Sequence, residues 1–530
     1  MNILITNANI YTVDPLQPRA RAIAIANNRI VAVGSDAEIN AIRLPDMQTL
    51  DLNGAFVVPG MIDAHLHLLW TGLAMMRVFI HEAPTVATVA DRVREKAAQM
   101  PRGQWIQGHG WMQVAWGGEF PTAADLDAAT RDHPVALSAK SGHALWVNSL
   151  ALQLAGITAQ TPDPEGGQIV RDAGGYPTGV LLENAMGLVS RCIPGPSIEL
   201  EEQATLLAME AMNRKGITGV HCMDGGGGIQ SFRAYQRLRE QGKLLLRIVK
   251  QLPAEELDTI INSGIHSGFG DAWLRIGGVK IFADGALGPR TAAMLAPYEG
   301  ETDNYGIPTI EREALFEAVI KANSNGLAAV IHAIGDRANH DVLDAFEVSR
   351  QQTPRAPGQL RNRIEHAQIL HPDDIARFAG LDVIASVQPT HATSDMVMAD
   401  RHWGKRSANA YAIRALRDSG AHLAFGSDAP VENFDPLVGM HAAVTRRRAD
   451  GTPGPDGWYP EQRVTIEDAI RAYTLGAAYA GGMEHEVGSL EAGKLADLVV
   501  LSHDLTAIPG DELLSVKVER VMIDGLWREV

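Results

Sequence analysis

FVVPGMIDAHLH (residues 56–67) is a continuous apolar run that ends in a pair of histidines. Helix-like segments such as EREALFEAVIKANSN (311–325) separate most of the later runs of this kind. Continuous apolar strands that alternate with helices are typical of a buried parallel sheet. Eight such units predict an α/β fold, a (β/α)₈ TIM-like barrel, with its functional groups at the carboxyl ends of the strands. The other seven runs are KGITGVHCMD (215–224), LLLRIVKQL (244–252), LRIGGVKIFADG (274–285), GLAAVIHAIGD (326–336), RNRIEHAQIL (361–370), LDVIASVQP (381–389) and AHLAFGSDAP (421–430).

Both ends of the chain differ from this middle part. Short strand-like runs with Asn, Gly and Asp turns fill the first 58 residues, and GSLEAGKLADLVVLS (488–502) has the same texture. We therefore expect residues 1–58 and 484–530 to form one small β-sandwich domain around a barrel at 59–483. A span at about residues 75–200 follows the first barrel strand and is far longer than a barrel loop. We interpret it as an inserted subdomain, a lid or substrate-shaping element on the active-site side.

The composition narrows the class of protein. Of the 530 residues, 46% are hydrophobic and 21% charged, and 46 Lys and Arg face 63 Asp and Glu, for a net charge of −17. This acidic balance argues against nucleic acid or an anionic membrane as partner. Only two cysteines occur, and neither a secretory signal nor an apolar stretch of membrane-spanning length is visible. The sequence predicts a cytoplasmic globular protein without a disulfide framework.

His65 and His67 are two residues apart, which places both imidazoles on one face of a β-strand. Among 18 histidines such a pair also arises by chance. Here it directly follows PGMIDA (59–64), at the end of a strand. This position favours a pair of metal ligands.

Lys280 lies inside an apolar run, GGVKIFADG (277–285), where a charged amine is costly unless it is paired or neutralised. Three interpretations stay open. The stem can be buried while the ammonium reaches solvent, or the amine can form a Schiff base with a substrate. A neutral amine can also add carbon dioxide to give a carbamate, whose two oxygens suit two metal ions about 3.5–4 Å apart. The surrounding histidines favour the carbamate.

His332, His366 and Asp428 each end an apolar run. Either histidine could be a packed core residue, but an unpaired carboxylate after AHLAFGS (421–427) would be costly, and a metal would supply the missing charge. Imidazole with carboxylate suits Zn²⁺, with Mn²⁺, Fe²⁺ or Co²⁺ as alternatives. The candidate ligands at one barrel mouth are His65, His67, Lys280, His332, His366 and Asp428.

This order of residues resembles the amidohydrolase superfamily, and the tail GSLEAGKLADLVVL (488–501) looks like its C-terminal signature. More narrowly, the chain resembles the amidohydrolase-3 branch, which includes YtcJ-like proteins and N-substituted formamide deformylases. The motifs that carry this narrower resemblance are QGHGW (107–111), PTAADLDAA (121–129), SGHALWVNSLAL (141–152), KIFADGALG (280–288), IHAIGDRA (331–338), RIEHAQ (363–368) and FGSDAPV (425–431).

The resemblance implies a hydrolase with one or two metal ions that acts on an amide-type C–N bond. Under it, His65 and His67 bind the buried metal, a carboxylated Lys280 bridges, and His332 and His366 hold the second metal. Asp428 is then both ligand and general base. The family pattern after the tryptophan of QGHGW often continues with an acidic residue, whereas this chain has Met112, which puts the substrate contacts of the insertion in doubt.

Six further positions are candidates for weaker roles. His143 could donate to a substrate carbonyl or a developing oxyanion, or it could anchor a loop. Asp224, after the second barrel strand, is a candidate acid behind the metal ligands. The positions where a substrate pocket could form, although packed or surface roles are equally open to them, are Trp111, Glu183, Gln388 and His391.

These observations predict a metal-dependent hydrolase that cleaves a non-peptide C–N bond of a small molecule with metal-activated water. An esterase or lactonase on the same metal centre is an alternative. A Schiff-base lyase using Lys280 and a non-catalytic barrel that only binds a small molecule are further alternatives. At the family level, a homodimer is expected.

Overall fold

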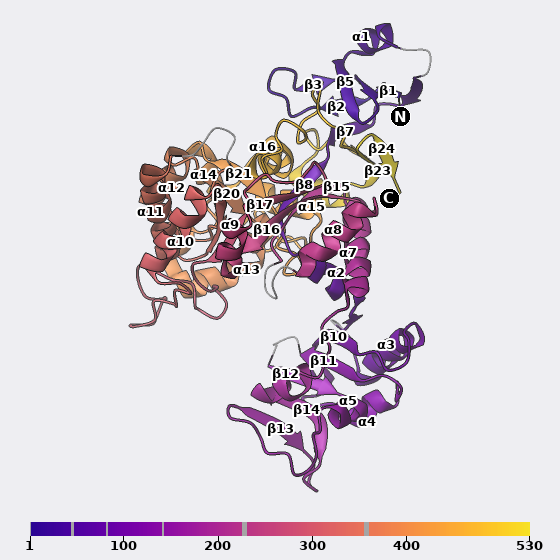
Figure 1. Cartoon of the computed structure of the whole chain (residues 1–530), viewed down its shortest axis with the longest axis vertical. Coiled ribbons are helices and arrows are strands. Elements are labelled where there is room, and N and C mark those ends of the chain that lie inside the picture. The colour runs from indigo at the N-terminus through magenta and orange to yellow at the C-terminus, as the bar shows by residue number, and fades with distance from the viewer. Residues whose placement is uncertain are drawn as a thin grey trace. The chain divides into compact units, whose positions relative to one another are not determined.

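The computed structural model describes residues 2–43, 47–80, 83–139, 143–224, 230–354 and 360–529. The chain divides into two compact units, one made of Met1–Thr71 with Thr205–Val530 and the other of Gly72–Ala204. Figure 1 shows the elements of both units. Within the described residues, no helix is both long and apolar enough to cross a bilayer.

The first unit contains an eight-stranded sheet in the order β21-β20-β19-β18-β17-β16-β15-β8, in which every neighbouring pair is parallel. Nearly all of the strand residues are buried, as strands covered on both faces must be. The predicted α/β barrel is therefore confirmed. Its strands are β8 (Met61–Leu66), β15 (Ile217–Cys222), β16 (Arg247–Pro253), β17 (Leu274–Phe282), β18 (Ala328–Ala333), β19 (Arg363–His366), β20 (Ile384–Val387) and β21 (His422–Phe425).

The last strand comes back to the first. The Asp428 amide donates to the His65 carbonyl at 2.6 Å, and the His67 amide donates to the Ala429 carbonyl at 2.8 Å. Gly426 makes this approach possible, because a Cβ there would lie 2.5 Å from the backbone nitrogen of His65. The glycine of FGSD thus brings Asp428 beside the two histidines.

Helices follow the strands around the barrel. Helix α11, for example, buries Val342, Leu343 and Phe346 along one stripe against the sheet. The helices of this unit are α2 (Leu68–Met76, which continues into the second unit), α7 (Ile198–Asn213, which begins there), α8 (Gln230–Glu240), α9 (Leu257–Asn262), α10 (Arg312–Ser324), α11 (Asp336–Gln352), α12 (Pro372–Gly380), α13 (Pro389–Trp403), α14 (Ile413–Asp418), α15 (Pro436–Thr445), α16 (Ile466–Arg471) and α17 (Ala477–Ala480).

The two chain ends build a pair of smaller sheets in the same unit. One has the order β5-β4-β1-β6 and the other β24-β23-β22-β7-β2-β3. Strand β22 pairs antiparallel with β7, with Val499 opposite Val58, so the two ends of the chain share a sheet. Their strands are β1 (Ile3–Thr6), β2 (Asn9–Tyr11), β3 (Arg19–Ala20), β4 (Ala22–Ala26), β5 (Arg29–Gly34), β6 (Gln48–Asp51), β7 (Phe56–Pro59), β22 (Leu498–Leu501), β23 (Val518–Ile523) and β24 (Leu526–Arg528), with α1 at Asp36–Ala41.

The second unit, Gly72–Ala204, spans the region interpreted above as an insertion. Its six-stranded sheet has the order β13-β14-β12-β11-β10-β9 and a core of its own that includes Trp111, Leu137 and Trp146. Its elements are β9 (Val78–Phe79), α3 (Val86–Ala98), β10 (Ile106–Trp111), α4 (Ala123–Asp127), β11 (Val135–Ala139), β12 (Ala144–Val147), α5 (Ser149–Leu154), β13 (Gly167–Arg171), β14 (Pro177–Glu183) and α6 (Gly187–Ser190).

Candidate metal centre

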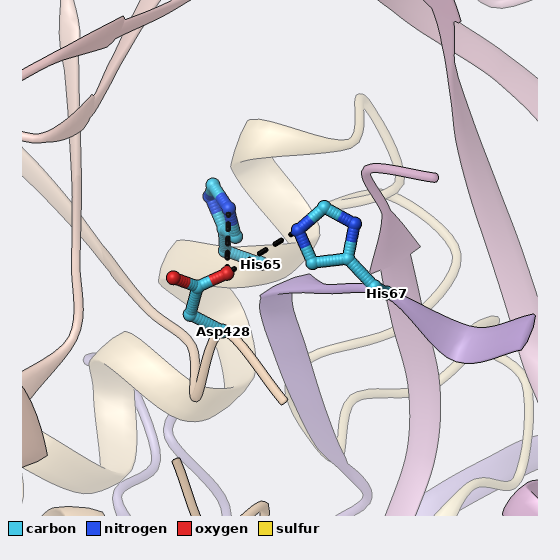
Figure 2. A group of neighbouring side chains, drawn as sticks. All are labelled: His65, His67 and Asp428. Carbon is cyan, nitrogen blue, oxygen red and sulfur yellow. Dashed lines mark ion pairs between the residues drawn. The ribbon is translucent and has the colours of Figure 1, made fainter. Parts of the chain in front are cut away.

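His65, His67 and Asp428 meet where β8 and β21 end (Figure 2). One oxygen of Asp428, Oδ1, lies 3.4 Å from Nε2 of His65 and 3.4 Å from Nε2 of His67. The three ligand atoms lie within 4.8 Å of one another, a spacing at which one metal ion could contact all three. Asp428 holds a left-handed backbone, with φ of +61°, which a non-glycine residue adopts only when its surroundings enforce it. The carboxylate is therefore pre-positioned against the histidine pair.

A second group of donors shares the same carboxylate. His366, His391 and Asp428 also offer ligand atoms within 4.8 Å of one another. His366 comes from the end of β19 and also has a left-handed backbone, with φ of +74°, and His391 lies in the first turn of α13. The sequence prediction placed His366 among the metal ligands and His391 only near a substrate pocket.

His332 and Lys280 come close to these groups without joining either. The ring of His332 lies 4.6 Å from that of His366, centroid to centroid, and its Nε2 is 2.9 Å from the carbonyl oxygen of Gly285. Because Nε2 makes this contact, Nδ1 is the nitrogen of His332 that could bind a metal. Lys280 is buried at the end of β17, and its Nζ lies 5.0 Å from the centre of the Phe282 ring.

Burial and neighbouring charges set the protonation of these groups. Burial by itself would raise the pKa of Asp428, but the hydrogen bonds of His65 and His67, with the charges of His65 and His366, outweigh it and hold that pKa well below its usual range. Burial lowers the pKa of Lys280 to about 8, against the opposing pull of Glu365 and Asp428. An ionised carboxylate and an amine that gives up its proton near neutral pH are the forms in which both side chains could bind a metal.

Three of the histidines have a polar side chain beside the ring nitrogen that points away from the donor groups. Nδ1 of His65 is 2.5 Å from Oε2 of Glu365, and Nδ1 of His366 is 2.8 Å from Oε1 of Gln388. Nδ1 of His67 faces Oδ1 of Asp224 at 3.6 Å. Such partners fix the tautomer and ring orientation of metal-binding histidines. Asp224 and Gln388, two predicted candidates, thus lie behind ligands.

Arg363 and Glu365 are functional candidates that the sequence reasoning missed. Both side chains are fully buried, with Nε of Arg363 2.5 Å from Oε1 of Glu365. Arg363 also donates to Oγ of Ser386 at 2.7 Å and to the Ala64 carbonyl at 2.6 Å, and its Nη1 lies 2.8 Å from Nδ1 of His221. One signal was present in the sequence, because RIEH puts an arginine and a glutamate on one face of a buried strand.

The model of the amidohydrolase family matches residues 48–526, about nine-tenths of the chain. The chain belongs to the amidohydrolase family. This confirms the resemblance drawn from the order of the ligand residues. Membership also makes the chain a hydrolase by class.

Three relatives resemble the chain over nearly its whole length. It is 35% identical to the protein LONG AFTER FAR-RED 3 of Arabidopsis thaliana, over 94% of this chain and 87% of that protein. It is 33% identical to the putative amidohydrolase YtcJ of Bacillus subtilis, over 97% of both chains. It is 31% identical to the N-substituted formamide deformylase of Arthrobacter pascens, over 99% of this chain and 98% of the enzyme.

Among solved structures, the chain resembles an uncharacterized metal-dependent hydrolase from Pyrococcus horikoshii. The TM-score is 0.81 at 30% identity, over 96% of this chain and 99% of the other. This similarity extends over the barrel, the terminal sheets and the inserted unit alike.

The remaining predicted residues belong to the second unit. Trp111 is buried in its core, and its Nε1 donates to the Leu137 carbonyl at 2.7 Å, so its ring supports the unit from within. His143 and Glu183 are exposed, with Nδ1 of the histidine 2.9 Å from Oε2 of the glutamate. Together with Phe120 and Leu182 they line a pocket of about 400 Å³ inside this unit. Met112, where the family pattern is often acidic, is exposed.

The donor groups fit a divalent metal ion. Among the described residues, Nε2 of His391 is buried on the side of Asp428 without a hydrogen-bond partner. A buried polar atom without a partner is costly, and a cation beside it can remove that cost. Each donor group joins two imidazoles to the Asp428 carboxylate, a borderline-soft set that Zn²⁺ prefers.

Proposed function

We propose that the chain is a metal-dependent hydrolase that cleaves a non-peptide C–N bond, in an amide or an N-formyl or N-acyl compound, of a small-molecule substrate. The observation that carries the proposal is Asp428, whose carboxylate is shared by the His65–His67 pair and the His366–His391 pair. The relative named N-substituted formamide deformylase, similar over nearly the whole chain, supports a C–N bond as the target. We further propose zinc as the metal, a cytoplasmic location and a homodimer.

His65, His67 and Asp428 would hold the first ion, and His332 and His366, with a carboxylated Lys280, would hold a second. When bound, such an ion polarises the substrate carbonyl and makes water a better nucleophile near neutral pH. In the resulting reaction, Asp428 takes a proton from the attacking water as its oxygen bonds to the carbonyl carbon. Asp428 then returns this proton to the leaving nitrogen as the C–N bond breaks, which gives a carboxylic acid and an amine.

Lys280 has the properties that carbamate formation requires. Its pKa of about 8 leaves a sizeable neutral fraction at physiological pH, and only a neutral amine adds carbon dioxide. The same property would suit a Schiff-base lysine. A Schiff-base enzyme would be inactivated by borohydride in the presence of substrate and would survive chelation, so the two chemistries are separable by experiment.

Metal removal tests the proposed function. We expect dialysis against a chelator to abolish hydrolysis of N-formyl and N-acyl amines, and Zn²⁺ or Co²⁺ with bicarbonate to restore it. Amine release from a panel of such substrates, and acid release from matched esters and lactones, are the measurements. Activity that persists in metal-free protein would contradict the proposal, and turnover of only the esters or lactones would favour the alternative of an esterase or lactonase.

Two apolar rings beside the ligands indicate the kind of substituent next to the scissile bond. Trp70 stacks on His67, with ring centres 4.5 Å apart, and stays 41% exposed. Phe282 lies 5.2 Å from the His332 ring and is 49% exposed. Large exposed rings next to a site are typical of apolar ligand contacts. We therefore expect substrates with an aryl or alkyl group near the amide.

Trp70→Ala tests this expectation. We expect KM for aryl-substituted amides to rise about 2- to 10-fold, matching the ~0.5–1.5 kcal/mol of an aromatic contact. The KM for substrates with only small substituents should change less. Steady-state kinetics on the two substrate series is the measurement, with Leu16→Ala, a change in an exposed apolar residue between β2 and β3, as the control. Equal effects on both series would argue against a ring contact.

A further inference from the structure

His391 is a buried histidine, and one of its ring nitrogens makes no hydrogen bond within the described part of the chain. Its side chain is 8% exposed, and its Nε2 has no hydrogen-bond partner among the residues that the structure describes. This nitrogen faces Oδ2 of Asp428 at 3.7 Å, too far for a hydrogen bond. An unsatisfied buried polar atom destabilises the folded state. Most buried polar atoms have a partner, and this one faces a group of metal-binding side chains instead.

The two oxygens of Asp428 face different histidines. Oδ1 lies 3.4 Å from Nε2 of both His65 and His67, whereas Oδ2 is the oxygen nearest to His391. A carboxylate that presents one oxygen to each side can bridge two cations. The His391 ring also lies parallel to that of His366, with an interplanar angle of 18° and centroids 5.9 Å apart. Two parallel imidazoles can point nitrogens at the same ion.

The far side of the His391 ring is held in a way that suits a ligand. Its Nδ1 is 3.3 Å from Nε2 of Gln368, which follows β19, so the amide as placed donates to the ring. An amide can present either its oxygen or its NH₂ group to a ring nitrogen. A flip of this amide would bring the Gln368 oxygen, which has no hydrogen-bond partner among the described residues, to the ring. Nδ1 would then carry the proton, and the lone pair of Nε2 would be directed toward Asp428.

We propose that His391 is a metal ligand, which together with His366 and Oδ2 of Asp428 holds a second divalent cation. This deepens the proposed function, on whose metal centre it rests. The pattern carried over from the family assigns the second ion to His332, His366 and Lys280, and His391 adds a donor from α13. The first cation stays with His65, His67 and Oδ1.

Metal stoichiometry tests the proposal directly. Metal-free full-length protein is titrated with Zn²⁺, and bound metal is measured by elemental analysis after desalting. We expect two ions per chain in the wild type and one in His391→Asn, because asparagine can keep the contact to Gln368 but cannot reach the position of Nε2. The second Kd should rise by more than the roughly 10- to 100-fold that loss of an outer partner causes.

His391→Phe, which fills the ring volume without a nitrogen, is measured in parallel, with the melting temperature of each metal-free variant as the check of folding. His441→Asn is the matched control, since His441 is another buried histidine on a helix, α15, outside both donor groups. It should bind two ions. A wild type that binds one ion, or a folded His391 variant that binds both with unchanged affinity, would overturn the proposal. Normal stoichiometry without hydrolysis of any substrate would instead contradict only the proposed function.

Discussion

Asp428→Asn is expected to lower kcat for C–N hydrolysis by roughly 10²- to 10⁴-fold, the contribution typical of a general acid–base group. Asparagine keeps the size of the side chain and an oxygen for the metal, but it cannot take up a proton. His65 and His67 would still bind the first ion, so we expect metal content at that position to persist. Single-turnover amine release, with elemental analysis of the same sample, separates loss of chemistry from loss of metal.

The control for this variant is Asp418→Asn, which changes an exposed carboxylate at the end of α14. The surface ion pairs of Asp418 with Arg414 and Arg417 contribute little to stability. Its kcat should match the wild type. An Asp428→Asn enzyme with full metal content and unchanged kcat would remove Asp428 from the mechanism and with it the assignment of this carboxylate as the base.

The barrel and the histidine pair were predictable because their signals are local. Eight apolar runs with polar ends specify parallel strands, and the i, i+2 spacing of His65 and His67 specifies a shared face. Asp428 could be anticipated because a carboxylate after an apolar run needs a counter-charge. Asp428 itself lies beyond the end of β21, and the close approach at Gly426 brings it to the histidines.

The partners of these groups were harder to predict because they depend on pairs of residues far apart in the chain. Glu365 contacts His65 across 300 positions, and no periodicity connects the two. His391 lies on a helix rather than at a strand end, so the rule that chemistry follows strands does not select it. His143 and Glu183 belong to a separate unit with its own sheet, and their neighbours follow from that fold alone.

Arg363→Met is expected to destabilise the barrel by about 3–5 kcal/mol, the cost of removing one partner of a buried ion pair. Burial by itself would raise the pKa of Glu365, but the Arg363 charge and the bond to His65 hold it well below its usual range. Methionine fills much of the space of the arginine stem but leaves the Glu365 carboxylate without its main counter-charge in the barrel interior. The midpoint of urea unfolding of the metal-free protein measures this loss of stability.

Arg361→Met is the matched control, because Arg361 lies two residues earlier and its pairs with Asp382 and Glu484, at 3.5 and 3.6 Å, are partly exposed. We expect Arg361→Met to lower the free energy of unfolding by less than about 1 kcal/mol.

The double variant Arg363→Met with Glu365→Gln separates charge from shape, since the glutamine removes the unpaired charge and keeps a group near His65. It should regain much of the lost stability, because neutral groups of similar shape can replace a buried ion pair at little cost. Its affinity for Zn²⁺ should nevertheless stay below that of the wild type, because a neutral amide polarises the His65 ring less than a carboxylate does. If the single Arg363→Met variant unfolded at the wild-type midpoint, the ion pair would contribute nothing to stability.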